Sequence, residues 1–433
     1  MRVFRYLPVL LVCAACGDEP SRDLAAVFNP AAEQYVKLAL ALGEHDADYV
    51  DAYFGPEEWR EQARAEAQSL AAIAAAAADL AAQVRSVAVA DEDEMVRLRQ
   101  DYIASHLESM ATVARLRNGE QLSFDEESRL VYGFVAPSFP VADYDAVLAE
   151  IDALLPGDAP LHERVYEFEL QFRIPTEKIE PVIRAGLDEC RRRTLQYMTL
   201  PAGESFQLEL VSGNPWGAYN WYKGGGQGLI QVETSRPKSV ASSITLGCHE
   251  GYPGHHAFSS LLDENFLRKR GWVEFSVLPL FSPQGVIFEG SGDFAEQIAF
   301  PGPSRNEFLN DVILPLAGLD NLDFATRDRL KTLTAKTRYA SIEAARNFLD
   351  GAWDRAQTGD WLTRYALTPP EELDAWFRFT ERYRAYQINY VLGEDLVAAY
   401  IARENPAGDP DGNWRAMEKL LSRPPTPLLL AGD

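Results

Sequence analysis

A short stretch of the chain places three of its six histidines within eight residues, next to a glutamate. It reads His249-Glu250-Gly251-Tyr252-Pro253-Gly254-His255-His256. Zinc that catalyses hydrolysis takes three protein ligands from histidine and carboxylate side chains and leaves one position for water, which a nearby carboxylate deprotonates. The clustering therefore predicts a metal site with His249 as one ligand and Glu250 as the adjacent base.

The spacing of these histidines also constrains the backbone. On an unbroken α-helix, position i+6 lies roughly 240° around the axis and position i+7 lies about 10 Å along it. Neither His255 nor His256 would then share an ion with His249. The four residues between Glu250 and His255 are glycine, tyrosine, proline and glycine, which break helices or restart them. We therefore expect a helix that is interrupted between Glu250 and Pro253 and restarts there, swinging one of the two later histidines back towards His249.

A downstream acidic segment offers a third ligand. Residues 288–296 carry Glu289, Asp293 and Glu296 among apolar side chains. Glu289 and Glu296 are seven residues apart and share a helix face, so Glu289 is predicted to bind the metal while Glu296 orients the outer nitrogen of a ligand. Asp293 is the alternative for that orienting role. The apolar neighbours suggest burial, where a carboxylate needs a partner.

The first residues have the pattern of a targeting segment. Arginines precede an apolar run from Tyr6 to Ala15 that is too short to span a bilayer. The run ends in Cys-Ala-Ala-Cys, which resembles a bacterial lipoprotein processing site. We predict a signal segment over residues 1–16 with the lipid on Cys16, followed by a tether over 17–28. Secretion with cleavage nearby is the alternative.

The composition limits the partners. The 433 residues carry 41 basic and 65 acidic side chains, a net charge of −24 that would repel phosphate backbones. We therefore expect no nucleic-acid partner. No later stretch reaches the roughly eighteen apolar residues of a spanning helix, so membrane contact is expected only through the N-terminal lipid. Of the cysteines beyond the signal segment, Cys190 and Cys248, we expect two buried thiols, with a single disulfide as the alternative.

The remaining pattern is mostly helical. Residues 29–200 are predicted to form a helical layer, with an alanine-rich stretch at 57–87. Alternation with period two at 206–211 and 228–234 predicts two strands, and the aromatic, glycine-rich loop between them is expected at a cleft edge. Helices then return, so 201–433 is predicted to be the catalytic part of the same domain. The expected fold is mainly α, with a small antiparallel sheet beside the active-site cleft.

With these residues in view, the chain resembles a bacterial family, many of whose members are lipoproteins: the domain-of-unknown-function 885 family. It is marked by His-Glu-x-x-Pro-Gly-His followed by Glu-Gly-x-x-x-x-x-Glu, and both motifs occur here, from His249 and from Glu289. They are similar to motifs of thimet oligopeptidase and Taq carboxypeptidase relatives, which are helical zincin-like metallopeptidases. The resemblance implies one zinc ion per chain on His249, His255 and Glu289, with Glu250 as base and a peptide as substrate. His256 is left beside the site or on its substrate side.

Near the C-terminus, Tyr383 and Tyr390 repeat the seven-residue tyrosine spacing of the oligopeptidase motif. That resemblance implies that both face the scissile carbonyl. A phenol can donate a hydrogen bond to the oxyanion of a tetrahedral intermediate, and the spacing i, i+7 puts both on one helix face. Ordinary aromatic packing is the alternative. Four arginines could pair with a terminal carboxylate if the fold brings them to the cleft: Arg338, Arg346, Arg382 and Arg384.

Taken together, these features predict a zinc-dependent peptidase of the bacterial cell envelope that acts on short peptides, as an oligopeptidase or a carboxypeptidase. One alternative is hydrolysis of another amide by the same centre. The other is a non-catalytic, metal-binding envelope lipoprotein. The presence of Glu250 argues against the latter, since a structural zinc site is usually closed by four ligands and needs no base.

Overall fold

The computed structural model describes residues 24–90, 92–214 and 216–431. The predicted signal segment with Cys16, and the first part of the predicted tether, lie outside these residues. Helix α1 (Leu24–Gly43) begins inside the range predicted as tether, and Phe28 is already buried in the core. Among the described residues, no helix is both long enough and apolar enough to cross a membrane.

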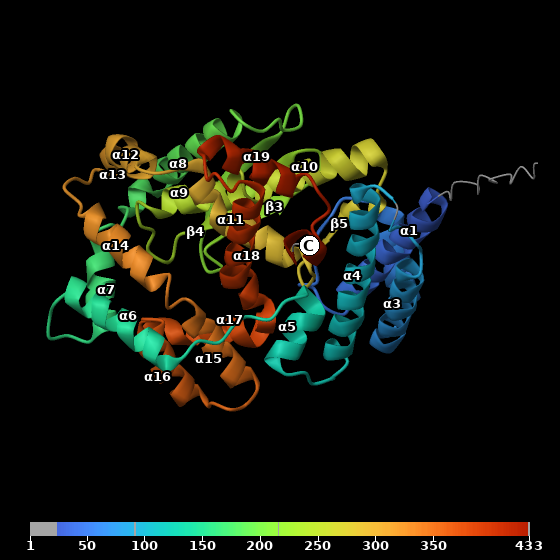
Figure 1. The fold of residues 1–433 in the computed structure, drawn as a ribbon, viewed down its shortest axis with the longest axis horizontal. Coiled ribbons are helices and arrows are strands. Elements are labelled where there is room, and N and C mark those ends of the chain that lie inside the picture. Colours follow the sequence, from blue (N-terminus) through green and yellow to red (C-terminus); the bar gives the residue numbers. More distant parts are fainter. Residues whose placement is uncertain (1–23, 91, 215, 432–433) are drawn as a thin grey trace, which may run out of the picture.

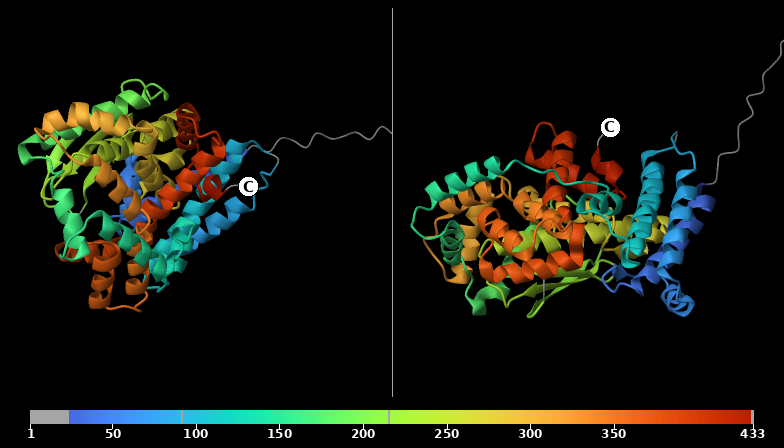
Figure 2. Two further views of the ribbon diagram at one scale, coloured as in Figure 1. Left: turned by 60° about the vertical axis from the view of Figure 1, so that its left-hand side comes forward. Right: turned by 90° about the horizontal axis from the view of Figure 1, so that it is seen from below.

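The first half of the chain is helical, as its composition predicts. The side chains of Ser69 and Asp93 cap helices α3 (Leu70–Arg85) and α4 (Glu94–Arg117) by accepting hydrogen bonds from backbone N–H groups three residues on. The alanine-rich stretch is divided in two, because Ala67 has a left-handed backbone with φ 44°. Helices α1, α3 and α4 lie side by side at one end of the molecule (Figures 1 and 2). The remaining elements of this half are α2 (Glu57–Glu66), α3 (Leu70–Arg85), α4 (Glu94–Arg117), α5 (Phe124–Tyr132), α6 (Val141–Leu154), α7 (Leu161–Leu170), η1 (Thr176–Lys178) and α8 (Ile179–Thr194).

Helices dominate the second half as well, and two of them, α11 (Gln284–Ala299) and α18 (Ile388–Glu404), pack closely against each other. A Cβ atom on Gly290 would overlap the backbone of Gly393, so the glycines allow this approach. The helical elements are α9 (Ser242–Leu246), η2 (Gly247–Gly251), α10 (His255–Leu262), η3 (Asp263–Arg268), η4 (Val273–Ser276), α11 (Gln284–Ala299), α12 (Ser304–Phe308), η5 (Leu309–Ile313), α13 (Leu314–Ala317), α14 (Phe324–Thr334), α15 (Tyr339–Leu349), α16 (Arg355–Tyr365), η6 (Pro370–Glu372), α17 (Leu373–Tyr383), η7 (Arg384–Gln387), α18 (Ile388–Glu404), α19 (Pro410–Leu421) and α20 (Pro427–Ala431).

A three-stranded sheet contains both predicted strands, β2 (Ser205–Val211) and β4 (Gln227–Glu233), in the order β2-β4-β3. The loop between them contributes β3 (Ala218–Tyr222), which is antiparallel to β4 as expected. However, β2 and β4 are parallel, so the expectation of a purely antiparallel sheet is wrong for this pair. The reason is the connection: the chain leaves β2, forms β3 at the opposite edge, and returns between them as β4. A second, two-stranded antiparallel sheet joins β1 (Val50–Tyr53) to β5 (Val277–Pro279).

The two halves of the chain share one core. A single large cluster of buried apolar residues includes side chains from Phe28 to Leu430, and two small clusters lie under α6 and α16. A buried ion pair also links the halves, with Arg99 Nε 2.6 Å from Glu274 Oε1. The mainly α fold with a small sheet is therefore confirmed, and its helical layer is packed into the same core as the segment that carries the motifs.

Cys190 of α8 and Cys248 of η2 form a disulfide, with their Cα atoms 5.4 Å apart. The expectation of two buried thiols is therefore wrong, and the alternative of a single bridge is correct. Glycine permits the close approach, because a Cβ atom on Gly186 of α8 would overlap the backbone of Ser243. A link across 58 residues restricts the unfolded chain and stabilises the fold by about 4 kcal/mol. The bridge anchors η2, which carries the first histidine of the motif.

His106 gives the fold a measurable pH dependence. It is 1% exposed, and its ring lies against Tyr102 with ring centroids 3.9 Å apart. Burial lowers the pKa of His106 from 6.5 to about 4. Between these values the unfolded chain binds a proton that the folded chain does not, so the free energy of unfolding falls as pH drops from 6.5 to about 4.

We expect His106→Gln to remove this dependence. The wild type should lose about 2 kcal/mol more than the variant in free energy of unfolding between pH 7 and pH 5, measured by urea titration. His45→Gln is the matched control, because His45 is exposed and its replacement should leave the wild-type slope intact. Identical slopes for the wild type and His106→Gln would contradict the assignment.

Candidate metal centre

The histidine motif folds as an interrupted helix. Helix α9 continues into the wider turn η2, which carries His249 and Glu250, and the chain is extended at Tyr252. Helix α10 then begins at His255. The predicted interruption between Glu250 and Pro253 is therefore confirmed, although the new helix starts at His255 rather than at Pro253.

Gly254 allows the chain to double back at this interruption. A Cβ atom at this position would overlap the backbone oxygens of His249 and Cys248. The Gly254 N–H donates to the Cys248 oxygen over 3.0 Å. Because only glycine fits here, the chain can bring the His255 ring to a centroid distance of 4.4 Å from the His249 ring.

Glu289 of α11 completes a group of three ligand types. Its Oε2 lies 3.3 Å from His249 Nε2 and 3.6 Å from His255 Nε2. One ligand atom from each residue lies within 4.8 Å of the others, and all three side chains are buried. The buried group of His249, His255 and Glu289 could therefore bind a metal ion.

The spacing of the three ligand atoms suits a cation. Four-coordinate zinc bonds nitrogen and oxygen at about 2.0–2.2 Å, which puts neighbouring ligand atoms about 3.3 Å apart in a tetrahedron. The Nδ1 atom of His249 lies 3.0 Å from Asp293 Oδ1 and is placed to donate its proton there. The Nε2 atom then faces the Glu289 carboxylate at 3.3 Å, a contact that is favourable when either a proton on Nε2 or a metal ion lies between the two atoms. The donor set thus fits a metal ion.

Asp293, not Glu296, contacts the outer nitrogen of His249. Asp293 lies one helical turn after Glu289, and the position before it is Gly292, where a Cβ atom would come within 2.9 Å of the His249 ring. The ring therefore packs directly on α11 at the level of Asp293. Burial opposes protonation of His249, but the carboxylates of Asp293 and Glu289 outweigh it and raise its pKa well above the usual value.

The carboxylate of Glu296 is held by other partners. It accepts a hydrogen bond from Thr245 Oγ1 at 2.6 Å and forms ion pairs with Arg305 and Lys331. Burial alone would raise the pKa of Glu296, yet the two cations lower it to about 2. The predicted orienting role of Glu296 therefore fails: one further helical turn carries its side chain past the ligands and into an ion-pair network.

His256 points away from the three ligands. It is fully buried, and its Nε2 lies 3.2 Å from Glu204 Oε2, which also accepts a hydrogen bond from the Tyr252 hydroxyl. It is also not among the residues that line a cavity of about 330 Å³ beside the three ligands. The choice of His255 over His256 therefore agrees with the geometry, whereas the expectation of a substrate-side His256 does not.

Glu250 lies at the cavity wall beside the ligands and is 6% exposed. Within the described part of the chain it forms no ion pair. Burial raises the pKa of Glu250, as do the charges of Glu289 and Asp293, while the two histidines lower it. A carboxyl group that is buried, unpaired and open to the cavity can accept and release a proton.

Three tyrosines line the same cavity: Tyr383, Tyr386 and Tyr390. The Tyr386 hydroxyl donates to Glu289 Oε1 over 2.5 Å and so orients that carboxylate. Sequence reasoning missed Tyr386, although its spacing of three and four residues from the other tyrosines was an available signal. The helix also breaks here, because Arg384 has φ 50°. The prediction that Tyr383 and Tyr390 lie on one face of a continuous helix is therefore wrong. Both side chains still line the cavity.

The cavity has a volume of about 330 Å³ and is built from both halves of the chain. Trp216, Tyr219 and Trp221 of the loop and β3 form one wall, which confirms that this segment borders a cleft. Asp51 of β1 also lines it and accepts a hydrogen bond from the Tyr219 hydroxyl. Sequence reasoning missed Asp51, because no local pattern marks it and its partner is 168 residues away.

Of the four predicted arginines, only Arg382 lines this cavity. Its guanidinium is already bound to Asp48, with Nε 2.7 Å from Oδ2 and Nη2 2.5 Å from Oδ1. The other three form ion pairs elsewhere: Arg338 with Glu394 and Asp395, Arg346 with Asp125 and Glu343, and Arg384 with Glu127. The described structure thus presents no unpaired arginine, from this set, to a terminal carboxylate.

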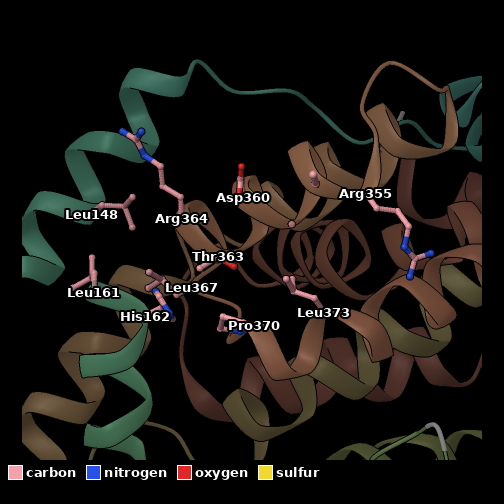
Figure 3. Close-up of a pocket in the computed structure, with 12 residues that line it drawn as sticks. Leu148, Leu161, His162, Arg355, Asp360, Thr363, Arg364, Leu367, Pro370 and Leu373 are labelled. Carbon is pink, nitrogen blue, oxygen red and sulfur yellow. The ribbon is translucent and has the colours of Figure 1, made fainter. Parts of the chain in front are cut away.

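A larger cavity of about 590 Å³ lies between α6, α7 and α16 (Figure 3). Leu148, His162 and Asp360 are among its lining residues, and none of the motif residues reaches it. Among the residues that the structure describes, its lining brings together no group of metal ligands of the kind found at the motif site. The motif residues line the smaller cavity, which is therefore the candidate functional site.

The chain matches no family model and no curated protein sequence. A solved structure described as "the putative lipoprotein from Colwellia psychrerythraea" is similar to it with a TM-score of 0.49 and 15% sequence identity, over 84% of this chain and 66% of that one. This chain thus spans just under two thirds of the length of that protein. The case for a function comes from the residues of the chain itself.

Proposed function

We propose that this protein is a zinc-dependent peptidase that hydrolyses short peptides at the cell envelope. The observation that carries the proposal is the position of Glu250, which is buried and unpaired beside the group of His249, His255 and Glu289. A closed structural zinc site has four ligands and needs no base. Three ligands with an adjacent free carboxylate are the set that hydrolysis requires.

Zinc on these ligands would polarise a substrate carbonyl and lower the pKa of water in the remaining position. Glu250 accepts the proton of the attacking water and passes it to the leaving amine. Tyr390 or Tyr383, both in the cavity wall, donates a hydrogen bond to the oxyanion. Asp293 holds His249 in the tautomer that leaves Nε2 free, and Tyr386 holds Glu289.

The size of the cavity supports short peptides as the substrates. Pockets for small ligands measure about 300–1,000 Å³, and the 330 Å³ here is at the lower end of that range. A few residues of an extended chain fit such a space, whereas a folded protein does not. The envelope location rests on the lipoprotein-like sequence that ends at Cys16.

The proposal predicts that purified protein contains about one zinc ion per chain, as a mononuclear site requires. Elemental analysis measures the metal, and mass spectrometry of a peptide-library digest measures the cleavage. A chelator should abolish cleavage, and added zinc should restore it. Zinc-loaded protein that cleaves another amide but no peptide would favour the alternative hydrolase. Zinc without any hydrolysis would favour a metal-binding protein.

A further inference from the structure

Acidic side chains outnumber basic ones in the cavity wall. Apart from the histidines, Arg382 is the only basic residue among the described residues that line it, against Asp48, Asp51, Glu250 and Glu289. The bidentate contact with Asp48 neutralises Arg382. Glu289 belongs to the ligand group, and Glu250 lies beside it.

Asp51 carries a carboxylate whose charge is offset only in part, by His255 in the same cavity wall. Within the described part of the chain it forms no ion pair, and its Oδ1 accepts the hydrogen bond from Tyr219. Burial is the largest influence on the pKa of Asp51 and raises it, the bond from Tyr219 and the charge of His255 lower it, and the charges of Glu289 and Glu250 raise it, so that the pKa is about 6. At neutral pH the group is therefore ionised in surroundings that disfavour its charge, and a cation in the cavity would relieve this.

Aromatic rings line the same cavity as this carboxylate. The Tyr219 ring lies 4.5 Å from the Trp221 ring and 5.7 Å from the Trp216 ring, measured between centroids. Trp221 is 38% exposed although it is a large apolar side chain. The faces of tryptophan and tyrosine attract cations. A carboxylate and such rings in the wall of one cavity form a chemically suitable binding site for an ammonium group.

We propose that Asp51 selects substrates by binding a protonated amine of the peptide, with the Trp216 and Trp221 rings beside it. This inference rests on the proposed peptidase function and names its substrate class: peptides that bring an ammonium group close to the scissile bond. The ammonium is supplied by a free N-terminus or by a lysine side chain. Recognition through the terminal carboxylate is disfavoured, because Arg382 is held by Asp48.

The test compares versions of one short peptide: unmodified, N-acetylated, C-amidated, and N-acetylated with one lysine added. Binding is measured by calorimetry on zinc-loaded Glu250→Gln protein, which separates recognition from turnover. N-acetylation should weaken binding about 10- to 100-fold, the effect of losing a charged hydrogen bond, and C-amidation should have little effect. Recovery of binding in the acetylated lysine peptide would identify the side chain as the source of the ammonium.

The decisive variant is Asp51→Asn, made in the same Glu250→Gln background. Asparagine keeps the Oδ1 acceptor for Tyr219, so the wall retains its shape while the charge is removed. This variant should bind free and acetylated peptides about equally, with unchanged zinc content. Glu209→Gln is the control, because Glu209 is exposed on β2 and outside the cavity. It should keep the preference of the parent protein.

Three results would overturn the inference: a preference for the free amine that survives Asp51→Asn, weaker binding on C-amidation but not on acetylation, or no binding of any peptide. The second result would identify Arg382 as the anchor. An Asp51-dependent preference in a wild-type protein that hydrolyses nothing would refute the peptidase and keep the recognition site. Hydrolysis by the wild type without any Asp51-dependent preference would support the peptidase and refute the recognition site.

Discussion

The variant Glu250→Gln is expected to keep one zinc ion per chain and to lose about 10²–10⁴-fold in turnover, the usual effect of removing a general base. Glu250 is not part of the ligand group, so its amide should leave the metal in place. The amide has nearly the same shape but cannot accept the proton of water. Because the lost interaction acts in the transition state, kcat should fall while KM stays near its wild-type value.

Elemental analysis and steady-state kinetics on one peptide measure both quantities. Glu209→Gln, exposed on β2, is the matched control and should behave as the wild type. Full zinc with unchanged turnover would remove Glu250 as the base. Loss of zinc would instead make Glu250 a ligand, and the site would then need a different proton acceptor.

The interrupted helix could be predicted from sequence because its causes are local. On one unbroken helix, His249 and His255 could not bind the same ion. The residues between them include the glycine that the turn requires. Backbone sterics over a few residues therefore determine where the helix ends and restarts. The same holds for the alternation that located β2 and β4.

Other features depend on contacts between distant segments. The direction in which β2 and β4 pair follows from where the chain places β3, and alternation carries no information about that. Asp51 meets Tyr219 only because β1 pairs with β5 and so reaches the cavity. The disulfide likewise depends on the close approach of α8 and η2. Packing of the whole fold, not local propensity, decides these contacts.

The roles of Asp293 and Glu296 show the limit of helical spacing as an argument. Both lie on the same side of α11 as Glu289, so periodicity allowed either one to orient His249. What decided between them was the level at which η2 crosses α11, and the gap that Gly292 leaves there for the imidazole. One turn further on, the carboxylate of Glu296 forms ion pairs with Arg305 and Lys331 instead.

These assignments predict a graded series for zinc. Glu289→Gln should strip the metal, because the substitution removes one of three ligands. Asp293→Asn should weaken zinc affinity about 10- to 100-fold, the typical effect of losing the partner of a ligand histidine. Glu296→Gln should leave zinc affinity nearly unchanged and lower the thermal midpoint of unfolding, since it breaks a buried ion-pair network.

Competition with a chelator of known affinity measures the zinc constants, and a thermal melt of the metal-free proteins measures stability apart from binding. Glu296→Gln serves as the matched control for Asp293→Asn, because both changes neutralise a carboxylate on α11. Equal weakening in these two variants would mean that helix charge, not the contact with His249, sets the affinity. Full zinc retention in Glu289→Gln would remove Glu289 from the site and leave His249 and His255 without the carboxylate that the geometry gives them.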